Sequence, residues 1–484
     1  MSVVTERACN LLKKLLSACS FMYLVYMSNE LLSSLGAMRT FHQTGATRSY
    51  NYRKQQLLAL KNAIKAHEQE IYAALHADLK KSAEEVWITE NGLLLHEIDH
   101  AINWLSAWME PERKKTNLLN FPSRSYIIKE PLGVVLIIGP WNYPLQLLFM
   151  PLVGAIAAGN CVVLKPSEFA PATALVMQQI IEQTFPKEYI LFVPGDGATV
   201  IPLMMNQFSF DHVFYTGSTA VGKIIYKMAA ERLVPVTLEL GGKSPCVVTA
   251  DANIKVTANR IVITKFSNAG QMCVAPDYIL VHKSVKNALI TALIERIVRF
   301  FSDHPQQSDE YGKIINEKQF HRLLTYLNQA TIIHGGDHDI NTLYISPTLL
   351  DNVKLDSPIM RDEIFGPILP IIEYTTEEEA LAIIQQNPNP LAFYIFSSND
   401  KTAKHWIAQV PSGAACINNA SWHVTNQHLP FGGRGFSGTG NYHGKYSFDT
   451  FSHAKAVLKT PTWFDPALKY PPFKGKLKLF KRFL

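Results

Sequence analysis

One cysteine of this chain differs from the others in its sequence surroundings. Cys273 ends the run Asn268-Ala-Gly-Gln-Met-Cys273, which is small and polar and follows an expected helix. A substrate can reach a thiol in such a loop, and its thiolate form is a nucleophile. Most free cysteines are inert core residues, so a packed thiol is the alternative. That alternative fits the cysteines that lie among apolar, strand-like residues, namely Cys161, Cys246 and Cys416.

A carboxylate and an amide could serve a reaction at this thiol. Glu239 ends an apolar stretch in the run Glu239-Leu-Gly-Gly-Lys243, and partial burial would raise its pKa toward that of a general base. Asn142 lies in a turn, residues 139–144, that two prolines and a glycine make rigid. A rigid amide can donate to an oxyanion. The alternatives are an ion pair between Glu239 and Lys243, and an Asx-type turn at Asn142.

Two further segments favour a phosphate-bearing ligand. Residues 211–222 have the pattern of strand, turn and helix, in which Gly217 permits the turn and a hydroxyl at 218 or 219 can cap the helix. The N-terminus of that helix suits a pyrophosphate, although a capped helix that binds nothing has the same pattern. Lys165 and Glu168 follow another expected strand, where ligands of parallel sheets gather. Both could bind ribose hydroxyls, or they could form a solvated ion pair.

The apolar pattern predicts the elements that position these residues. Spacings of three, four and seven predict helices over 55–79 and 86–109. Continuous apolar runs predict buried strands at 132–139, 160–165, 189–193 and 212–215, with helices over 145–158 and 173–183. A second α/β region is expected from about Val236, with strands at 236–240, 246–248 and 278–281 and helices over 256–266 and 287–301. This alternation indicates parallel sheets covered by helices.

Composition and charge exclude several classes of function. A chain of 484 residues suggests two to three domains. Of the net charge of +6, residues 469–484 carry +6 and the first forty carry +2, so the body is close to neutral, which argues against nucleic-acid binding. The six cysteines are sparse, which favours a reducing compartment, and they lack the spacing of metal ligands, so no metal site is expected.

The two ends of the chain have their own character. Leu15–Met27 is an apolar run after basic residues, too short to span a bilayer, and is either a signal or anchor or part of a dispensable extension. The extension is the favoured hypothesis, with Met27 or Met38 as the true start. Residues 473–484 interleave Phe and Leu with cations, a pattern typical of a tail on an anionic membrane surface or of a solvated basic tail.

Taken together, the motifs resemble the aldehyde dehydrogenase superfamily in order and spacing over about residues 39–472. The segments that carry the resemblance are Pro140-Trp-Asn-Tyr-Pro144, Lys165-Pro-Ser-Glu168, Thr216-Gly-Ser-Thr-Ala-Val-Gly222, Glu239-Leu-Gly-Gly-Lys243, Gly270-Gln-Met-Cys273 and Glu363-Ile-Phe-Gly-Pro367. Residues 274–278 and 442–453 are similar to the class 3 branch, which includes fatty aldehyde and coniferyl aldehyde dehydrogenases. Arg434 and Met272 depart from the residues common in that branch.

The resemblance implies a role for each matched residue. Cys273 would be the nucleophile and Glu239 the general base, and Asn142 with the backbone N–H of Cys273 would form the oxyanion hole. The implied cofactor-binding residues are Lys165, Ser167, Glu168, Gly217, Ser218, Thr219, Ala220, Val221, Gly222, Glu363 and Phe365. The cofactor would be NAD, with NADP as an alternative, because Glu168 would repel a 2′-phosphate and Lys165 could offset that repulsion.

The resemblance also implies an α/β fold with a Rossmann-like parallel-sheet NAD domain, an α/β catalytic domain and a small oligomerisation arm. The expected boundaries are 1–38 for the extension, 39–240 for the NAD(P)-binding domain, 241–425 for the catalytic domain, 426–468 for the C-terminal segment and arm, and 469–484 for the basic tail. The implied activity is oxidation of medium- or long-chain aliphatic or aromatic aldehydes by a cytoplasmic homodimer, with peripheral contact of the tail with the inner membrane surface. The alternatives are an acyl reductase using NADPH, a cofactor-independent esterase or thioesterase, and a non-catalytic protein of the same fold.

Overall fold

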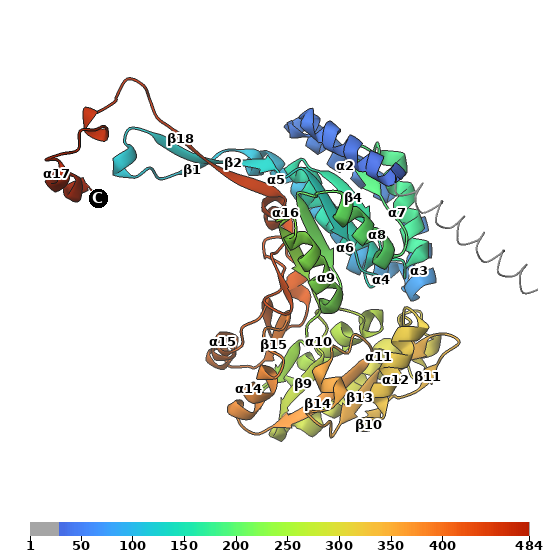
Figure 1. Ribbon diagram of the computed structural model, residues 1–484. Coiled ribbons are helices and arrows are strands. Elements are labelled where there is room, and N and C mark those ends of the chain that lie inside the picture. Colours follow the sequence, from blue (N-terminus) through green and yellow to red (C-terminus); the bar gives the residue numbers. More distant parts are fainter. Residues whose placement is uncertain (1–28, 484) are drawn as a thin grey trace, which may run out of the picture.

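The structure consists of two α/β lobes and a long arm that projects from the first of them (Figure 1). It is a computed structural model that describes residues 29–483. The apolar run Leu15–Met27 therefore lies outside the described residues. Within the described part of the chain, no helix is both long and apolar enough to cross a membrane.

The first lobe is built on a six-stranded sheet with the order β17-β7-β6-β3-β4-β5. Its strands are β3 (Val134–Ile138), β4 (Cys161–Lys165), β5 (Ile190–Phe192), β6 (His212–Thr216), β7 (Val236–Glu239) and β17 (Gly438–Thr439). All neighbours pair in parallel except β17, which is antiparallel to β7. The residues of β3, β4, β5 and β6 are buried throughout, which is why these strands are mainly apolar.

The helices that alternate with these strands follow the predicted segments, except that the helix over 197–207 was not predicted. They are α6 (Pro144–Ala158), α7 (Pro171–Thr184), α8 (Gly197–Gln207) and α9 (Thr219–Ala230). The predicted strand at 236–240 belongs to this sheet as β7, and the second lobe begins only after it. The expectation of a second region from Val236 was therefore wrong by one strand, because an apolar run does not show which sheet a strand joins.

Helices before β3 complete the first lobe, and they are interrupted at more positions than predicted. The segment predicted as one helix over 55–79 is covered by two helices, α2 (Tyr50–Ala66) and α3 (Glu68–Leu79), which are separated at His67. The buried residues Ile64 and Ile71 are seven apart across this break, so the helical spacing continues through it. The next helices are α4 (Ala83–Val86), the π-helix η2 (Trp87–Asn91) and α5 (Gly92–Met109).

A helix over residues 29–43 precedes these elements. Leu35 and Met38 in this helix are fully buried in the core. The expected boundary between residues 38 and 39 thus falls inside a packed helix. Residues 29–38 therefore belong to a packed helix of the described structure.

The second lobe contains a seven-stranded sheet with the order β10-β13-β14-β9-β8-β15-β16. Its strands are β8 (Pro245–Val248), β9 (Tyr278–His282), β10 (Thr331–His334), β13 (Thr348–Asp351), β14 (Ile368–Tyr374), β15 (Ala392–Phe396) and β16 (Ala414–Ile417). Its helices are α10 (Ile254–Phe266), α11 (Lys286–Phe301), α12 (Glu317–Leu327), α13 (Pro358–Arg361), α14 (Glu377–Gln385) and α15 (Asp400–Gln409). A short hairpin, β11 (His338–Asp339) with β12 (Tyr344–Ile345), lies beside it.

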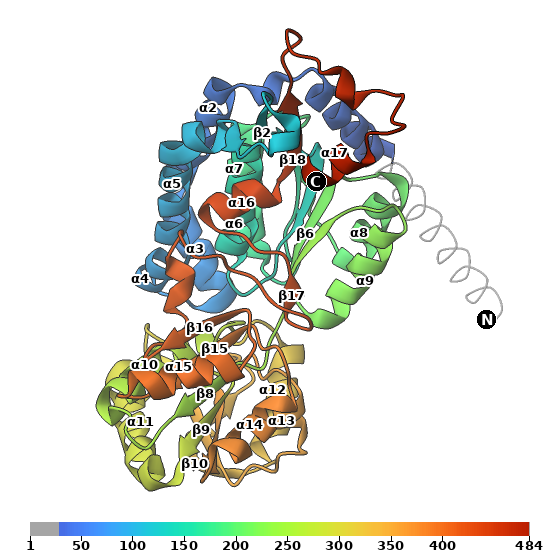
Figure 2. The ribbon, with the colours of Figure 1, turned by 90° about the vertical axis from the view of Figure 1, so that its left-hand side faces the viewer.

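The arm is an antiparallel sheet with the order β1-β2-β18. It combines β1 (Glu112–Lys114) and β2 (Arg124–Pro131) with β18 (Ser452–Lys459), which arrives after the chain has returned from the second lobe through β17 and α16 (Gly444–Thr450), as Figure 2 shows. The arm therefore draws on residues before β3, not only on 426–468. The C-terminal helix α17 (Leu477–Phe483) lies at the far end of the arm (Figure 1).

Candidate functional site

The predicted site residues of the first lobe lie at one edge of its sheet. Asn142 follows β3, Lys165 ends β4, Gly217 follows β6 and Glu239 ends β7. These strands are parallel neighbours, so their carboxyl ends face the same side. This is the edge at which ligands of open parallel sheets bind. The second lobe brings Cys273 to the same region.

Cys273 follows a tight loop at the end of α10. In that loop Asn268 and Ala269 adopt left-handed backbone conformations, with φ of 50° and 49°. Side-chain bonds hold the loop, because Gln271 Nε2 donates to the Asn268 and Lys313 carbonyls at 3.0 and 2.9 Å. The Cys273 side chain is half-buried and lines a cavity of about 540 Å³.

The other described cysteines lie in strands, whereas Cys273 lies in a loop. Cys161 and Cys246 are buried in strands, as expected. Cys416 lies in β16 but is only half-buried, and its sulfur lies 3.3 Å from Nδ1 of His423. Cys416 packs against the core but is less buried than expected, because β16 is an edge strand of its sheet.

The Asn142 amide is directed toward the cysteine loop. Its Nδ2 donates to the carbonyl of Gln271 at 3.1 Å, and the residue is only 3% exposed. An amide nitrogen carries two hydrogens, so one remains for a substrate oxygen. The Asn142 backbone carbonyl accepts from Asn268 Nδ2 at 2.8 Å. The side chain therefore bridges to Gln271 instead of closing a local Asx-type turn.

Glu239 is buried, and neither carboxylate oxygen has a hydrogen-bond partner. Burial raises the pKa of its carboxyl well above the usual value. Lys243, the partner considered in the sequence, instead pairs with Asp277 and donates to the Ile359 and Asp362 carbonyls. Among the described residues no cation pairs with Glu239, so once it is ionised its carboxylate is a strong proton acceptor.

Electrostatics connect Cys273 with two carboxyl groups. Burial raises the pKa of the Cys273 thiol, and the charges of Glu363 and Glu239 raise it further. The thiol is therefore protonated in the protein alone at neutral pH. A base or a bound positive charge has to favour the thiolate before it can attack.

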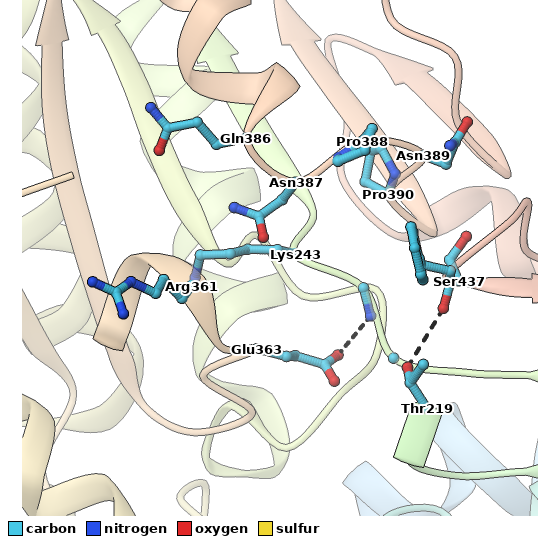
Figure 3. A pocket seen from close by; sticks show the side chains of 13 residues that line it. Thr219, Lys243, Arg361, Glu363, Gln386, Asn387, Pro388, Asn389, Pro390 and Ser437 are labelled. Atoms are coloured by element: carbon cyan, nitrogen blue, oxygen red, sulfur yellow. Dashed lines mark hydrogen bonds between the residues drawn. The ribbon is translucent and has the colours of Figure 1, made fainter. Parts of the chain in front are cut away.

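Glu363 lies between α13 and β14, on the wall of a second cavity of about 350 Å³. Its Oε1 accepts from the backbone N–H of Gly242 at 3.1 Å, and a Cβ at Gly241 would collide with Oε2. Burial, together with the charge of Asp277, raises the pKa of Glu363 to about 8. Figure 3 shows Glu363 across this cavity from Thr219, which donates to the Phe436 carbonyl at 3.4 Å.

Phe365 lies next to the turn that carries Asn142. It adopts a left-handed conformation with φ of 48°, and its ring meets the edge of Trp141 at a centroid distance of 5.2 Å. Trp141 directly precedes Asn142. The segment that carries Glu363 and Phe365 is thereby packed against the segment that carries the predicted oxyanion donor.

Lys165 and Glu168 form a polar corner beyond β4. Lys165 is 1% exposed, and its Nζ lies 2.5 Å from the Pro166 carbonyl and 3.4 Å from Glu168 Oε2. Glu168 is one-third exposed and accepts from the N–H of Gly197, at the start of α8. Ser167 is buried, and its hydroxyl accepts from Phe169 N–H. The corner thus offers an ammonium and a carboxylate to a ribose.

The α9 helix begins with the expected cap. Ser218 accepts from the N–H of Val221 at 3.4 Å, and the turn at Gly217 is fixed by its N–H donating to the Glu239 carbonyl. Ala220 and Val221 are exposed on the first turn, whereas Gly222 packs against Leu240. This helix end and the corner at Lys165 follow nearby strands, β6 and β4, so the residues present fit a dinucleotide.

The comparisons with known proteins agree with this arrangement. The model of the aldehyde dehydrogenase family matches residues 34–457. This chain belongs to the aldehyde dehydrogenase family. The matches include several family 3 members, so the expected class 3 resemblance is confirmed.

Three relatives show how far the similarity extends. The chain is 49% identical over 450 residues to the 4,4′-diaponeurosporen-aldehyde dehydrogenase of Staphylococcus aureus, covering 92% of this chain and 97% of that protein. It is 43% identical to the dimeric NADP-preferring aldehyde dehydrogenase of Canis lupus familiaris, covering 91% and 97%. The substrate-bound structure of Staphylococcus aureus AldH superposes with a TM-score of 0.91 at 48% identity, covering 94% and 99%. The predicted fold is thereby confirmed, and the chain is an aldehyde dehydrogenase.

The cavity at Cys273 of this aldehyde dehydrogenase is largely apolar. Its lining includes Leu147, Met272, Val274, Phe300, Phe301, Trp422, Val424, Phe431 and Tyr442. His443 also lines it, and burial lowers the pKa of its imidazole to about 3, so this ring is neutral at pH 7. Arg434, in contrast, is exposed and does not contribute to the lining.

Sequence reasoning missed two buried ion pairs near the site. Lys81 pairs with Glu90 at 2.7 Å, and Lys243 pairs with Asp277. No local pattern marks these pairs, because their members lie on different elements.

Proposed function

We propose that this aldehyde dehydrogenase oxidises aldehydes to carboxylates through covalent intermediates on Cys273, with NAD or NADP as the cofactor. The observation that carries the proposal is the half-buried Cys273 thiol in an apolar cavity, near an anchored Asn142 amide and a Glu239 carboxyl whose oxygens have no partner. When bound, the oxidised nicotinamide supplies a hydride acceptor and a positive charge.

The proposed reaction has two stages, formation of a thioester on Cys273 and its hydrolysis. The Cys273 thiolate attacks the aldehyde carbon, and the new oxyanion accepts hydrogen bonds from Asn142 Nδ2 and from the backbone N–H of Cys273. Loss of hydride from this tetrahedral adduct leaves a thioester on Cys273. Glu239 then takes a proton from water, and the resulting attack releases the carboxylate and restores the thiol.

The lining of the cavity supports medium- or long-chain aliphatic or aromatic aldehydes as substrates. At about 540 Å³ it has the size of a typical small-molecule site. Glu84, Glu85 and Glu310 also line it, which disfavours anionic substrates. The relative in Staphylococcus aureus is named 4,4′-diaponeurosporen-aldehyde dehydrogenase, after an aldehyde substrate.

The preference of the cavity can be measured with a panel of aldehydes. We expect kcat/KM to rise from acetaldehyde to decanal, by about tenfold for every two methylenes that become buried, at about 0.8 kcal/mol per methylene. An aldehyde of similar length with a terminal carboxylate should be a poor substrate. Equal kcat/KM values for all three would contradict an apolar binding cavity.

For the cofactor, the position of Glu168 supports NAD. Its carboxylate can accept from a ribose 2′-hydroxyl and would repel a 2′-phosphate, whereas Lys165 lies close enough to offset part of that repulsion. The relative in Canis lupus familiaris is described as NADP-preferring, so dual use stays within the proposal.

Replacement of Glu168 by glutamine tests this assignment. We expect the ratio of kcat/KM for NADP to that for NAD to rise by about tenfold, because about 1.4 kcal/mol of charge repulsion is removed. Glu182→Gln, an exposed change on α7, is the matched control. An unchanged ratio would show that Glu168 does not determine the preference between NAD and NADP.

The arm supports assembly into a homodimer, and the free cysteines support a reducing, cytoplasmic compartment. Strand β18 is an edge strand, and an unpaired edge can join a second chain. Exposed apolar side chains gather near it, namely Leu118, Phe121, Leu458 and Trp463. The described cysteines are free thiols, as a reducing compartment allows.

The basic tail supports peripheral contact with an anionic membrane. Leu477 and Phe473 are more than half exposed among Lys474, Lys476, Lys478 and Lys481. We expect the protein to sediment with vesicles that contain phosphatidylserine and not with neutral vesicles. Replacement of these four lysines by glutamine should abolish sedimentation, at roughly 1 kcal/mol for each cation. Equal sedimentation of both proteins would favour a solvated tail.

A further inference from the structure

A fully buried ion pair lies beneath the turn that carries Asn142. Lys81 Nζ lies 2.7 Å from Glu90 Oε1, and both side chains are 0% exposed. Lys81 follows α3, whereas Glu90 lies in the π-helix η2, a kind of insertion often found at functional sites. Burial of two charges is costly, so further hydrogen bonds have to offset the loss of water.

Lys81 makes those further contacts with the turn itself. Its ammonium donates to the backbone carbonyl of Asn142 at 3.1 Å and lies 3.8 Å from the centre of the Tyr143 ring. One cation therefore holds two consecutive residues of the turn, one through a hydrogen bond and one through a cation–π contact.

Glu90 holds the other end of the same turn. Its second oxygen, Oε2, accepts from the N–H groups of Leu145 and Gln146 at 3.0 and 3.3 Å. These groups belong to the first turn of α6, where a carboxylate is also favoured by the helix dipole. The ion pair thus fixes the backbone on both sides of Pro144.

The contacts of Lys81 and Glu90 with this turn matter because the Asn142 amide has to point at a developing negative charge. One N–H of Nδ2 is already used by the Gln271 carbonyl, so the direction of the other depends on the backbone position of residue 142. A displacement of about 1 Å at a catalytic group can cost about 10²-fold in rate. Neither Lys81 nor Glu90 lines the cavity, so any effect on the reaction passes through the turn.

We infer that Lys81 and Glu90 are positioning residues that hold the Asn142 amide at the place where the oxyanion forms. The inference rests on the proposed role of Asn142. It assigns to a buried ion pair a function in the acylation of Cys273, in addition to its part in the fold.

The double variant Lys81→Met with Glu90→Gln tests this inference. Glutamine keeps an oxygen for the N–H groups of α6, and methionine fills the space of lysine without leaving a buried charge unpaired. The matched control replaces another ion pair, Lys286→Met with Asp351→Asn, whose charges lie 2.9 Å apart between α11 and β13 of the second lobe. Should the double variant not fold, Glu90→Asp takes its place, because it keeps both charges and shortens only the reach of the carboxylate toward Leu145 and Gln146.

Two rates report on the acylation step. One is the burst of NADH formation with an aldehyde, and the other is hydrolysis of 4-nitrophenyl acetate without dinucleotide, which also passes through an oxyanion on Cys273. We expect the double variant to lower both rates by about tenfold. The melting temperature should stay close to that of the control variant, and KM for the aldehyde should be unchanged.

Combination with Asn142→Ala separates positioning from a purely structural role. If the pair acts through Asn142, its replacement in the Asn142→Ala background should change either rate by less than about twofold, because coupled effects are not additive. A further tenfold loss in that background, or unchanged rates in the double variant, would overturn the inference. Absence of NADH formation by the unaltered protein would count against the proposed function. The rates of 4-nitrophenyl acetate hydrolysis in the single and combined variants would still decide the role of the pair.

Discussion

Replacement of Cys273 by alanine is expected to lower aldehyde oxidation by at least about 10³-fold, because alanine has no nucleophile with which to form the covalent adduct. Dinucleotide affinity should stay within a few-fold, since Lys165, Glu168 and Glu363 keep their own contacts without the thiol. The measurements are NADH absorbance with a saturating aldehyde and titration of the dinucleotide by calorimetry.

Cys416→Ala is the matched control for this experiment. Cys416 is also half-buried, but it lies in β16 and contacts His423 instead of lining the cavity. We expect this variant to keep its turnover. Full activity of Cys273→Ala, or a comparable loss in Cys416→Ala, would exclude the assignment of the nucleophile.

The second large effect is expected for Glu239→Gln. This variant should release about one NADH per site in a fast burst and then turn over about 10²- to 10⁴-fold more slowly, which is the usual contribution of a general base. The reason is that hydride loss precedes the step in which Glu239 activates water. Rapid-mixing absorbance separates the burst from the steady rate. An equal loss of the burst would show that Glu239 also takes the proton of the Cys273 thiol, whose pKa is raised by burial.

The pH dependence of the same variant provides an independent check. The raised pKa of Glu239 means that steady turnover in the wild type should increase with pH as the carboxyl loses its proton, and this increase should be absent in Glu239→Gln. The folded state also holds this proton at pH values where the unfolded chain has lost it. The free energy of unfolding of the wild type should therefore fall, relative to the variant, as pH rises above about 4.5.

Glu97→Gln is a suitable control for these pH effects. Burial raises the pKa of Glu97 to about 7, and this carboxylate accepts from Gly444 N–H at 2.6 Å, between α5 and α16. We expect Glu97→Gln to alter the pH dependence of stability without altering that of turnover. A turnover profile changed as much as that of Glu239→Gln would remove the basis for assigning Glu239 as the base.

The strands that carry the site could be predicted because their pattern is local. Residues 132–139 and 160–165 form continuous apolar runs, and β3 and β4 lie within them, buried on both faces. The break between α2 and α3 at His67 could not be predicted, because the apolar spacing continues across it. The same limit applies to β7, whose sheet depends on its partner β6, and to the arm, whose β18 pairs with β2 more than 300 residues earlier.

The sequence by itself determined which chemical groups are present and at which strand or loop end each one stands: the Cys273 thiol, the Glu239 carboxyl, the Asn142 amide and the cap of α9. These follow from short-range patterns, since a turn or a strand end is encoded within a few residues. Only the tertiary structure decided their partners. Lys243 binds Asp277 and leaves Glu239 unpaired, while Lys81 and Glu90 meet under the Asn142 turn. Ion pairs and burial depend on which elements pack against one another, and that packing sets both the pKa of a carboxyl and the direction of an amide.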